Sequence, residues 1–188
     1  MPKQKITKEM VVDAAFELAR EGGMERVLVK DIAARLGCSV QPIYSYCKNM
    51  DGLRRDVYAR VRAFVWEYLA QAGGSFQGTG HAYVRLAREE PELFKLFTLC
   101  PREGVACLED LYRAETVPGM AQAIAEELRL EPEAARRLHL NMMIYTIGLG
   151  TIFSVADPGI QAEEIYTWQE QAYQAFLKQE QERNAHEP

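Results

Sequence analysis

The chain has 188 residues, 48% of them hydrophobic, and a formal net charge of −5 at pH 7. This length fits one large domain or a small domain joined to a medium one, and the apolar fraction is ample for a buried core. The sequence contains no uninterrupted apolar run of 18 residues, and its first ten residues contain no apolar segment. We therefore expect no membrane span and no signal peptide, and we expect the protein to be cytoplasmic.

Charge is distributed unevenly along the chain. Residues 1–60 carry 11 Lys and Arg against 8 Asp and Glu, a net charge of +3, whereas residues 61–188 carry 11 against 19, a net charge of −8. A locally basic region is sufficient to neutralise phosphates, so the acidic total does not exclude binding to nucleic acid. The distribution favours a basic N-terminal part that contacts DNA and an acidic remainder that does not.

The segment over residues 32–53, IAARLGCSVQPIYSYCKNMDGL, predicts a helix-turn-helix. Its first helix has apolar residues at helical spacing and is followed by Gly37, where a helix end favours a left-handed residue. Ser39 suits the N-cap of a second helix, in which Ile43 faces the core. Pro42 falls in the first turn of that helix, where most backbone N–H groups have no helical partner. The second helix of such a motif can enter the DNA major groove.

Side-chain chemistry divides the candidate DNA contacts of this motif into two groups. Candidates for contact with base edges are Ser39, Val40, Gln41 and Ser45. Candidates for contact with phosphate are Lys30, Tyr44, Tyr46 and Lys48. Glutamine can pair with adenine and valine can contact the thymine methyl, whereas phosphate contacts fix the register without carrying sequence information. Two alternatives remain: Tyr46 either contacts DNA or packs between helices, and Lys3 and Lys5 either contact phosphate or lie in a solvated arm.

The remainder of the sequence predicts further helices and no strand. One helix is expected before the motif, capped by Thr7 and ended by the Gly22-Gly23 pair. After the motif, helices are expected over about residues 51–72, 81–89, 91–100, 104–128 with an interruption near Pro118, 132–157 and 161–181. The segment GGSFQGTG at residues 73–80 is expected to be a loop and the natural boundary between domains. The expected fold class is therefore all-α, with about nine helices.

The cysteines and histidines form no pattern that predicts metal or catalytic chemistry. Cys38, Cys47, Cys100 and Cys107 lack paired spacing, so free thiols are expected, with redox sensing by the last two as the alternative. The three histidines are scattered, and we expect no metal site and no cofactor. A thiol enzyme that combines Cys100 or Cys107 with His139 has no supporting motif, so no catalytic residue is expected.

Residues 7–55 resemble the tetracycline-repressor (TetR) family of bacterial transcription regulators. The resemblance rests on AAFELAREGG followed by VKDIAARLGCSVQPIYSYCKNMDGL, which contains the Ile43-Tyr44 pair, Tyr46 and Leu53. The later segment AYVRLAREEPELFKLF resembles one branch of the family's C-terminal domains. The sequence departs from the family pattern at Met50, where lysine is usual, and Lys48 lies two residues earlier.

The resemblance implies an N-terminal three-helix helix-turn-helix domain, residues 1–52, joined to a C-terminal helical ligand-binding and dimerisation domain, residues 53–188. It implies a homodimer on a palindromic operator in double-stranded DNA, with the two recognition helices about one DNA turn, ~34–36 Å, apart. A small, largely apolar effector is expected to release a repressor from its operator by shifting the long helix after the motif. The alternative is a ligand-binding or scaffold dimer whose helix-turn-helix no longer binds DNA.

Two sets of residues are assigned to these roles in the C-terminal domain. Large apolar groups are candidates to line an effector pocket, with core packing as the alternative: Phe64, Tyr68, Phe94, Phe97, Tyr112, Met120, Met142 and Tyr145. Candidate polar anchors for the effector are His139, Asn141, Tyr145 and Thr146. Small and apolar residues of the last two helices are candidates for the dimer interface, with packing inside one chain as the alternative: Ile147, Gly150, Ile165, Trp168, Ala172, Tyr173 and Phe176.

Overall fold

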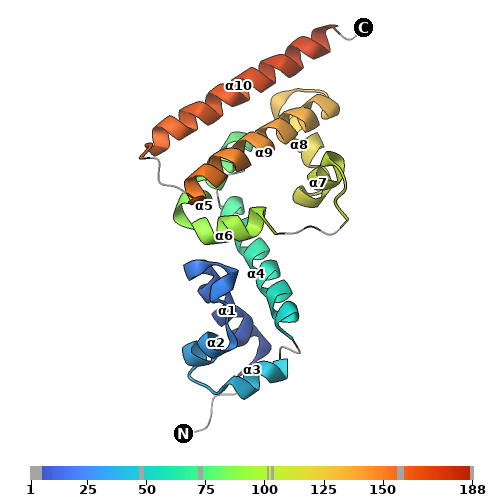
Figure 1. The fold of residues 1–188 in the computed structure, drawn as a ribbon. Helices are drawn as coiled ribbons and strands as arrows, with labels where there is room; N and C mark the ends of the chain where they lie inside the picture. Colours follow the sequence, from blue (N-terminus) through green and yellow to red (C-terminus); the bar gives the residue numbers. More distant parts are fainter. Residues whose placement is uncertain are drawn as a thin grey trace. The chain divides into compact units, whose positions relative to one another are not determined.

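The structure, a computed structural model, describes residues 6–46, 49–71, 74–100, 102, 104–155 and 159–186. In these ranges the backbone forms ten α-helices, one 3-10 helix and no strand, which confirms the all-α prediction. The helices are α1 (Lys8–Gly22), η1 (Met24–Arg26), α2 (Val29–Leu36), α3 (Val40–Tyr46), α4 (Met50–Ala70), α5 (Phe76–Glu89), α6 (Pro91–Thr98), α7 (Leu108–Glu115), α8 (Met120–Leu128), α9 (Pro132–Val155) and α10 (Ala162–His186) (Figure 1).

The chain packs as two compact units, which we describe separately. The first unit combines residues 1–71 with residues 86–100, and the second combines residues 72–85 with residues 101–188. The first unit therefore holds α1 to α4 and α6, the second holds α7 to α10, and α5 contributes residues to both. The functional division at residues 52 and 53 remains a prediction.

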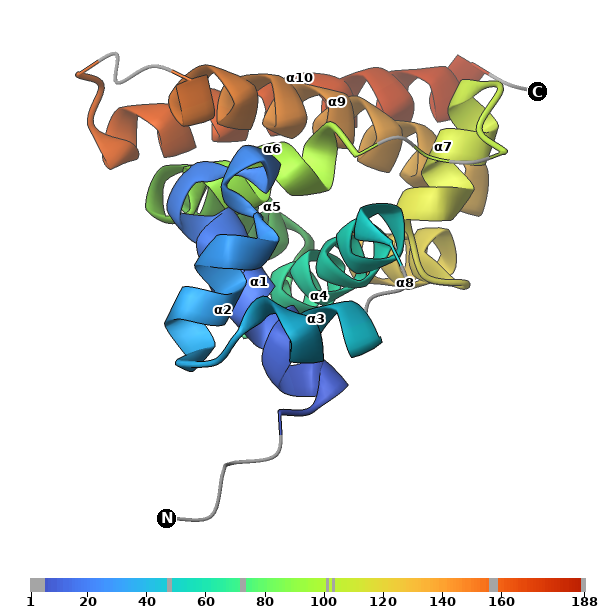
Figure 2. The same cartoon turned by 60° about the horizontal axis from the view of Figure 1, so that its bottom comes forward.

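The first four helices share a core that fixes the position of α3. The α4 residues Leu53, Val57, Val61, Val65 and Leu69 recur every four positions, and all of them are buried. Helix α1 packs against α2, α3 and α4, and Figure 2 shows these helices gathered in one group. Helices as short as α2 and α3 are marginal in isolation, so burial of apolar side chains, at about 25 cal/mol per Å², holds them in place.

Side-chain caps fix where α1 and α4 begin. The hydroxyl of Thr7 accepts the backbone N–H of Met10 at 3.2 Å, which confirms the predicted cap of α1. Asn49 has an extended backbone, and its side-chain oxygen accepts the N–H of Gly52 at 2.7 Å. Each cap satisfies an N–H group that has no partner inside the helix.

The corner between α5 and α6 is bound to both α1 and α4 within the first unit. The Tyr68 hydroxyl of α4 donates to Glu89 at 2.6 Å. Arg20 of α1 donates to both carboxylate oxygens of Glu90, through Nε at 2.7 Å and through a second guanidinium nitrogen. The same guanidinium lies 5.6 Å from the ring centroid of Phe64, which is an α4 residue. The carboxylates of Glu89 and Glu90 therefore bind the α5–α6 corner to α4 and α1.

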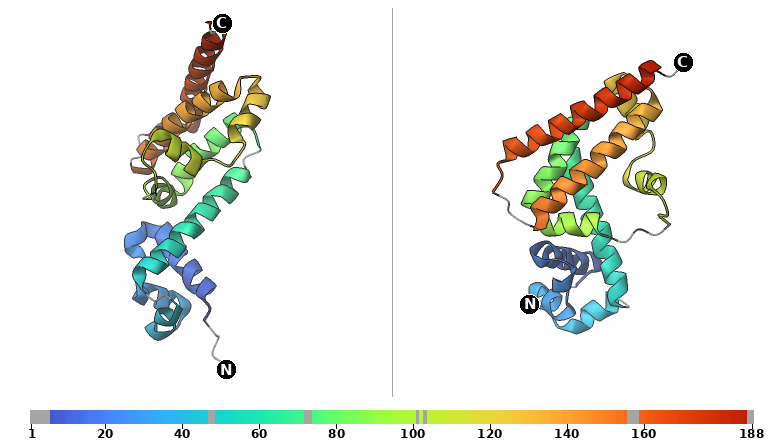
Figure 3. Two further views of the ribbon diagram at one scale, coloured as in Figure 1. Left: turned by 90° about the vertical axis from the view of Figure 1, so that its right-hand side faces the viewer. Right: turned by 45° about the horizontal axis from the view of Figure 1, so that its top comes forward.

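The second unit is organised around α10. Helices α9 and α10 run side by side in opposite directions (Figures 1 and 3). Leu149 packs against Ile165 at one end of the pair, and Arg137 donates to the buried Glu180 at 2.8 Å toward the other. A buried carboxylate needs such a partner, because an unpaired charge in the interior is costly.

The N-terminal part of α5 also contacts α10, again in the opposite direction. Val84 packs against Ile165, and Gln77, two turns earlier on α5, donates to Glu170 at 2.7 Å. Residue numbers therefore rise along α5 as they fall along α10. Helix α9 also runs in the opposite direction to α10, so α10 is covered by both α5 and α9.

The predicted loop over residues 73–80 is wrong for its second half, because α5 begins at Phe76. Ser75 explains the early start: its hydroxyl accepts the N–H of Gly78 at 3.0 Å, and its carbonyl accepts the hydroxyl of Thr79 at 3.0 Å. The local cap outweighs the glycines that suggested a loop. The predicted interruption near Pro118 is confirmed, since α7 and α8 are separate helices.

Helix α9 is the one described helix that is long and apolar enough, by length and composition alone, to cross a bilayer. Its 18-residue window has a mean hydropathy of 1.4, and a third of that window is buried. The core helix of a soluble protein meets both criteria as well. A single helix of this kind is weak support for a membrane span.

Substitution of Gly37 tests the turn between α2 and α3. Gly37 has φ 62° and ψ 33°, and a Cβ there would meet no atom within 4 Å. The left-handed backbone is then the only source of cost, so Gly37→Ala should lower the free energy of unfolding by about 1–2 kcal/mol in urea denaturation. An unchanged midpoint at an unchanged slope would show that the turn does not need a left-handed residue.

Candidate nucleic-acid interface

The turn that precedes α3 is closed by two backbone hydrogen bonds. The N–H of Cys38 donates to the carbonyl of Ala33 at 3.0 Å, and the N–H of Gly37 donates to that of Ala34 at 3.2 Å. This 6→1 and 5→2 pairing is a Schellman motif, which satisfies the last carbonyls of α2. The direction in which the chain leaves α2 toward α3 is therefore set by backbone geometry.

Helix α3 has one buried and one exposed face. Ile43 is fully buried, and α3 packs against α1 and α2. Val40, Tyr44 and Tyr46 are 43%, 60% and 38% exposed. Gln41 is exposed as well, so residues at positions 40, 41 and 44 share the outward face. The sequence-based placement of Ile43 in the core is confirmed.

The remaining predicted DNA contacts lie beside this face or outside the described residues. Ser39 and Ser45 are exposed, and the Ser45 hydroxyl donates to the carbonyl of Gln41 at 3.1 Å. Lys30 is exposed in the first turn of α2. Lys48, like Lys3 and Lys5, falls outside the described ranges. Tyr46 is partly open to solvent, so it is not enclosed between helices.

Several cations near the motif are already engaged by acids of the same unit. Arg35 pairs with Glu21, and Lys8 pairs with Asp56 at 2.8 Å. Among the described residues 6–71, Arg26, Lys30, Arg55 and Arg62 form no ion pair. These four cations are therefore available to another partner.

Arg55 is a candidate contact that the sequence reasoning missed. It is exposed in the second turn of α4, the helix that follows α3 in the chain. Arginine is well suited to phosphate because its planar guanidinium donates two parallel hydrogen bonds. The available signal was the Arg54-Arg55 pair, which directly follows the motif.

Residues 11–57, which include most of α1 and all of α2 and α3, match the family model described as "Bacterial regulatory proteins, tetR family". This segment is a TetR-type DNA-binding region. Over 100 residues the chain is also 23% identical to the "Uncharacterized HTH-type transcriptional regulator YobS" of Bacillus subtilis (strain 168). That alignment covers 50% of the chain and 52% of the relative, so the chain spans about half the length of this curated relative. Both matches describe regulators, and the family match supports a TetR-type helix-turn-helix in residues 11–57.

The eight residues predicted to line an effector pocket are divided between the two units of the chain. Phe64, Tyr68, Phe94 and Phe97 lie in the first unit, where Phe94 and Phe97 are buried core residues. Phe64 contacts the ring of Phe16 at 5.6 Å between centroids. These four side chains hold helices of the first unit together, which is the core-packing alternative for them.

The other four pocket candidates lie in the second unit and in different clusters. Met120 packs with the cluster around Ile124, Met142 belongs to the cluster around Leu138, and Tyr145 packs with the cluster around Ile165. Tyr112 is buried beside His139. Phe76 packs against the clusters of Met120 and Met142 and against the ring of His139, whereas Tyr145 lies in a separate cluster. Contact of these four side chains with an effector remains a prediction.

His139, a predicted polar anchor, is enclosed by aromatic rings of the second unit. A hydrogen bond of 3.0 Å joins its Nδ1 to the Tyr112 hydroxyl, and the ring of Phe76 packs edge-on at 5.6 Å. Burial lowers the pKa of His139 from 6.5 to about 4, so the imidazole is neutral at pH 7. The Cys107 thiol instead donates to Asp110 at 3.3 Å, so it does not pair with His139 as a thiol enzyme would require.

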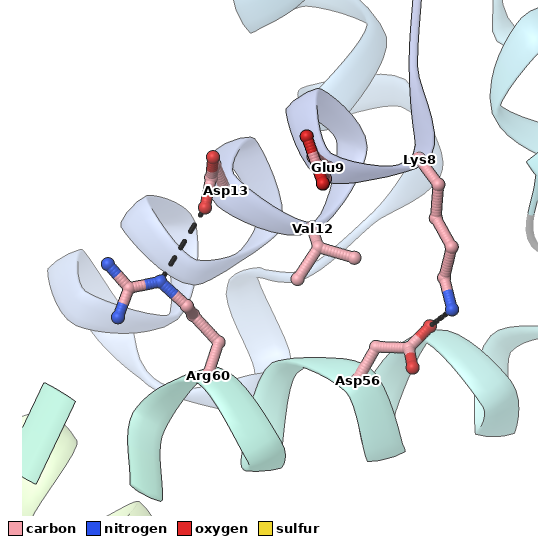
Figure 4. Close-up of a pocket in the computed structure, with 6 residues that line it drawn as sticks. All are labelled: Lys8, Glu9, Val12, Asp13, Asp56 and Arg60. Atoms are coloured by element: carbon pink, nitrogen blue, oxygen red, sulfur yellow. Dashed lines mark ion pairs between the residues drawn. The ribbon is translucent and has the colours of Figure 1, made fainter. Parts of the chain in front are cut away.

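An open cleft of about 510 Å³ lies between α1 and α4 in the first unit (Figure 4). Ion pairs cross it at both ends, Lys8 with Asp56 at 2.8 Å and Arg60 with Asp13 at 3.6 Å, with Val12 between them. Its lining is mostly charged and includes none of the eight predicted pocket residues. Exposed ion pairs of this kind join α1 to α4 but contribute little to the free energy of unfolding.

The residues predicted to form a dimer interface are largely covered within a single chain. Ile165 and Tyr173 are buried, and so is Gly150. Trp168, Ala172 and Phe176 are partly buried against the same clusters, and Ile147 is half-buried. The apolar face of α10 is thus used to pack against α5 and α9. For these residues the packing alternative accounts for the burial, and a part in a dimer remains a prediction.

Two substitutions on the outward face of α3 should have different effects on DNA binding. Tyr44→Phe should weaken binding to all sequences by about tenfold, because a hydrogen bond to a charged phosphate contributes about 1.5 kcal/mol. Gln41→Ala should relax the preference for one base pair and cost about 1–3 kcal/mol on the preferred site only. Fluorescence anisotropy at fixed salt, on a preferred and a scrambled duplex, separates the two. Loss of sequence preference in Tyr44→Phe would show that Tyr44 contacts a base and not only phosphate.

The buried His139 predicts a loss of stability in acid. Its pKa in the folded chain lies below its value in the unfolded chain, so the unfolded state binds more protons between pH 6.5 and about 4. The free energy of unfolding should therefore fall as pH decreases, by about 2 kcal/mol from this group between pH 7 and pH 5. His139→Gln, measured by urea denaturation at both pH values, should lose that much less than the wild type. Equal losses would show that His139 is accessible to protons in the folded chain.

Proposed function

We propose that this TetR-family chain is a cytoplasmic homodimeric repressor. Residues 1–52 bind a palindromic operator, and residues 53–188 bind a small, largely apolar effector and form the dimer. The observation that carries the proposal is the exposed face of α3, with Gln41 and Tyr44 outward while Ile43 anchors the helix. A short helix that is held rigidly and presents hydrogen-bonding side chains suits the major groove.

The charge distribution supports contact with DNA through the N-terminal part only. Residues 1–60 have a net charge of +3 and residues 61–188 a net charge of −8. Exposed cations without acid partners, such as Lys30 and Arg55, add to the attraction for phosphates. Repulsion of the acidic remainder favours one orientation of the protein on the duplex.

An apolar stripe on α9 supports dimerisation. Ile144, Ile152 and Val155 are 51%, 52% and 68% exposed, and the exposed Gly148 has no atom within 4 Å of a Cβ built on it. These positions are spaced by four, four and three residues, so they share one helical face. A second copy is the occupant that the function requires, because a palindrome is bound by two motifs related by a two-fold axis.

The attachment of the α5–α6 corner supports release by an effector. Glu89 and Glu90 connect this corner to Tyr68 of α4 and Arg20 of α1, and α1 packs against both α3 and α4. An effector that favours a different position of α5 would move this corner and, through it, the recognition helix. The shift is limited to the difference in affinity that the effector has for the two states.

Ile152→Glu tests the dimer and its link to DNA binding. The buried charge that a dimer would then contain should shift the protein from dimer to monomer in sedimentation velocity. Operator affinity in anisotropy should fall at least tenfold, because each monomer contributes only one half-site. The matched control is Gln171→Glu, which adds the same charge at an exposed polar position of α10.

A wild-type protein that sediments as a monomer, or a fully dimeric Ile152→Glu variant with normal affinity, would contradict the α9 interface. A stable wild-type dimer that binds no duplex from its own upstream region would instead support the scaffold alternative.

A further inference from the structure

Helix α7 lies in a segment, residues 104–119, that begins and ends at a left-handed glycine. Gly104 has φ 74° and Gly119 has φ 84°, and a Cβ on either would meet no atom of the described chain within 4 Å. Both glycines therefore serve the backbone conformation and not close packing. Arg102, just before the segment, pairs with the buried Glu115 near its end. Residues 104–119 thus form a loop that is closed at its base.

Two side chains of α7 attach this segment to two side chains of α9. Arg136 donates to Glu109 at 2.6 Å, and its guanidinium lies 5.9 Å from the ring centroid of Tyr112. One turn further along α9, Nδ1 of His139 lies 3.0 Å from the Tyr112 hydroxyl, and the two rings meet edge to face at 5.3 Å between centroids. In each helix the two residues are three positions apart, so they share one face.

The apolar residues of the segment add little to this attachment. Leu108 and Val117 are 57% and 52% exposed, and the buried residues of α7 are Tyr112 and Glu115 alone. One aromatic ring and a few polar contacts therefore bind the segment, whereas packed helices are held mainly by apolar burial. A segment bound in this way opens at a lower free energy than the unit as a whole unfolds.

His139 is the residue that an opening of this segment would expose. Among the described residues, Tyr112 is its one hydrogen-bond partner. The ring of Phe76 packs edge-on against the imidazole at 5.6 Å. Phe76 in turn packs against the clusters around Ile124 and Leu138. His139 therefore connects the segment to the apolar interior of the second unit.

We propose that residues 104–119 form a lid that opens about Gly104 and Gly119, and that the hydrogen bond between Tyr112 and His139 is its latch. Opening breaks this bond and exposes the imidazole of His139, a predicted polar anchor, to molecules in solution. A part for the lid in effector entry rests on the effector-regulated function proposed above. The opening itself is independent of that function.

Hydrogen exchange on the full chain tests the lid. A detached helix of eight residues is too short to keep its hydrogen bonds, so the amides of α7 exchange whenever the lid opens. In the wild type, amides of residues 111–115 should exchange at least tenfold faster than those of residues 138–150 in α9. Tyr112→Phe removes one hydrogen bond and keeps the ring, so it should speed exchange in α7 about fivefold further and leave α9 unchanged.

Tyr173→Phe is the matched control. It removes the hydroxyl of another buried tyrosine of the second unit, to which the described residues offer no hydrogen bond, and it should leave exchange in α7 unchanged.

Modification by diethyl pyrocarbonate at pH 7 separates lid opening from fraying of α7, because this reagent attacks neutral imidazole. The rate at His139 should rise about fivefold in Tyr112→Phe, with the half-buried His81 as an internal reference of constant rate.

Three results would overturn the lid: equal exchange rates in α7 and α9 of the wild type, unchanged exchange in Tyr112→Phe, or unchanged modification of His139 in that variant. Operator binding by the same samples keeps the two claims separate. A chain that binds operator while α7 exchanges together with α9 refutes only the lid, and a chain with a working lid that binds no operator refutes only the repressor.

Discussion

The paired attachment of Glu89 and Glu90 is the interaction on which the account of this regulator depends. Hydrogen bonds to charged groups are shorter and about twice as strong as neutral ones, and a bidentate arginine also fixes orientation. Arg20 provides such a pair to Glu90, while Tyr68 holds Glu89. The residues at the end of α5 are therefore part of the same packed unit as the helix-turn-helix.

Helix α5 therefore packs in both units. Its final residues belong to the first unit, whereas residues 76–85 belong to the second unit and contact α10. Among the described helices, α5 is the one that contributes residues to both units.

Local signals in the sequence were sufficient for the DNA-binding motif. The Thr7 cap, the left-handed Gly37 and the inward Ile43 each depend on residues within one or two turns, and all three are confirmed. The start of α5 was missed because the Ser75 cap is hidden among glycines.

The sequence did not predict in the same way which faces of α9 and α10 pack against neighbouring helices. Both α9 and α10 carry apolar residues on more than one face, and periodicity does not state which face meets which neighbour. Ile165 is consequently an inner residue and Ile152 an outer one, although the sequence suggested an interface at the former. Arg20 and Glu90 are 70 residues apart, and two charged residues at that separation give no signal in a single sequence.

The most direct measurement is selection of duplexes by the full-length protein from a pool of random DNA, followed by sequencing. The account predicts enrichment of a palindrome whose half-sites are centred about one DNA turn, 10–10.5 base pairs, apart, or a multiple of that spacing. Recovery of unenriched sequence, or of a single half-site without symmetry, would contradict the proposal that a dimer of this chain recognises an operator through α3.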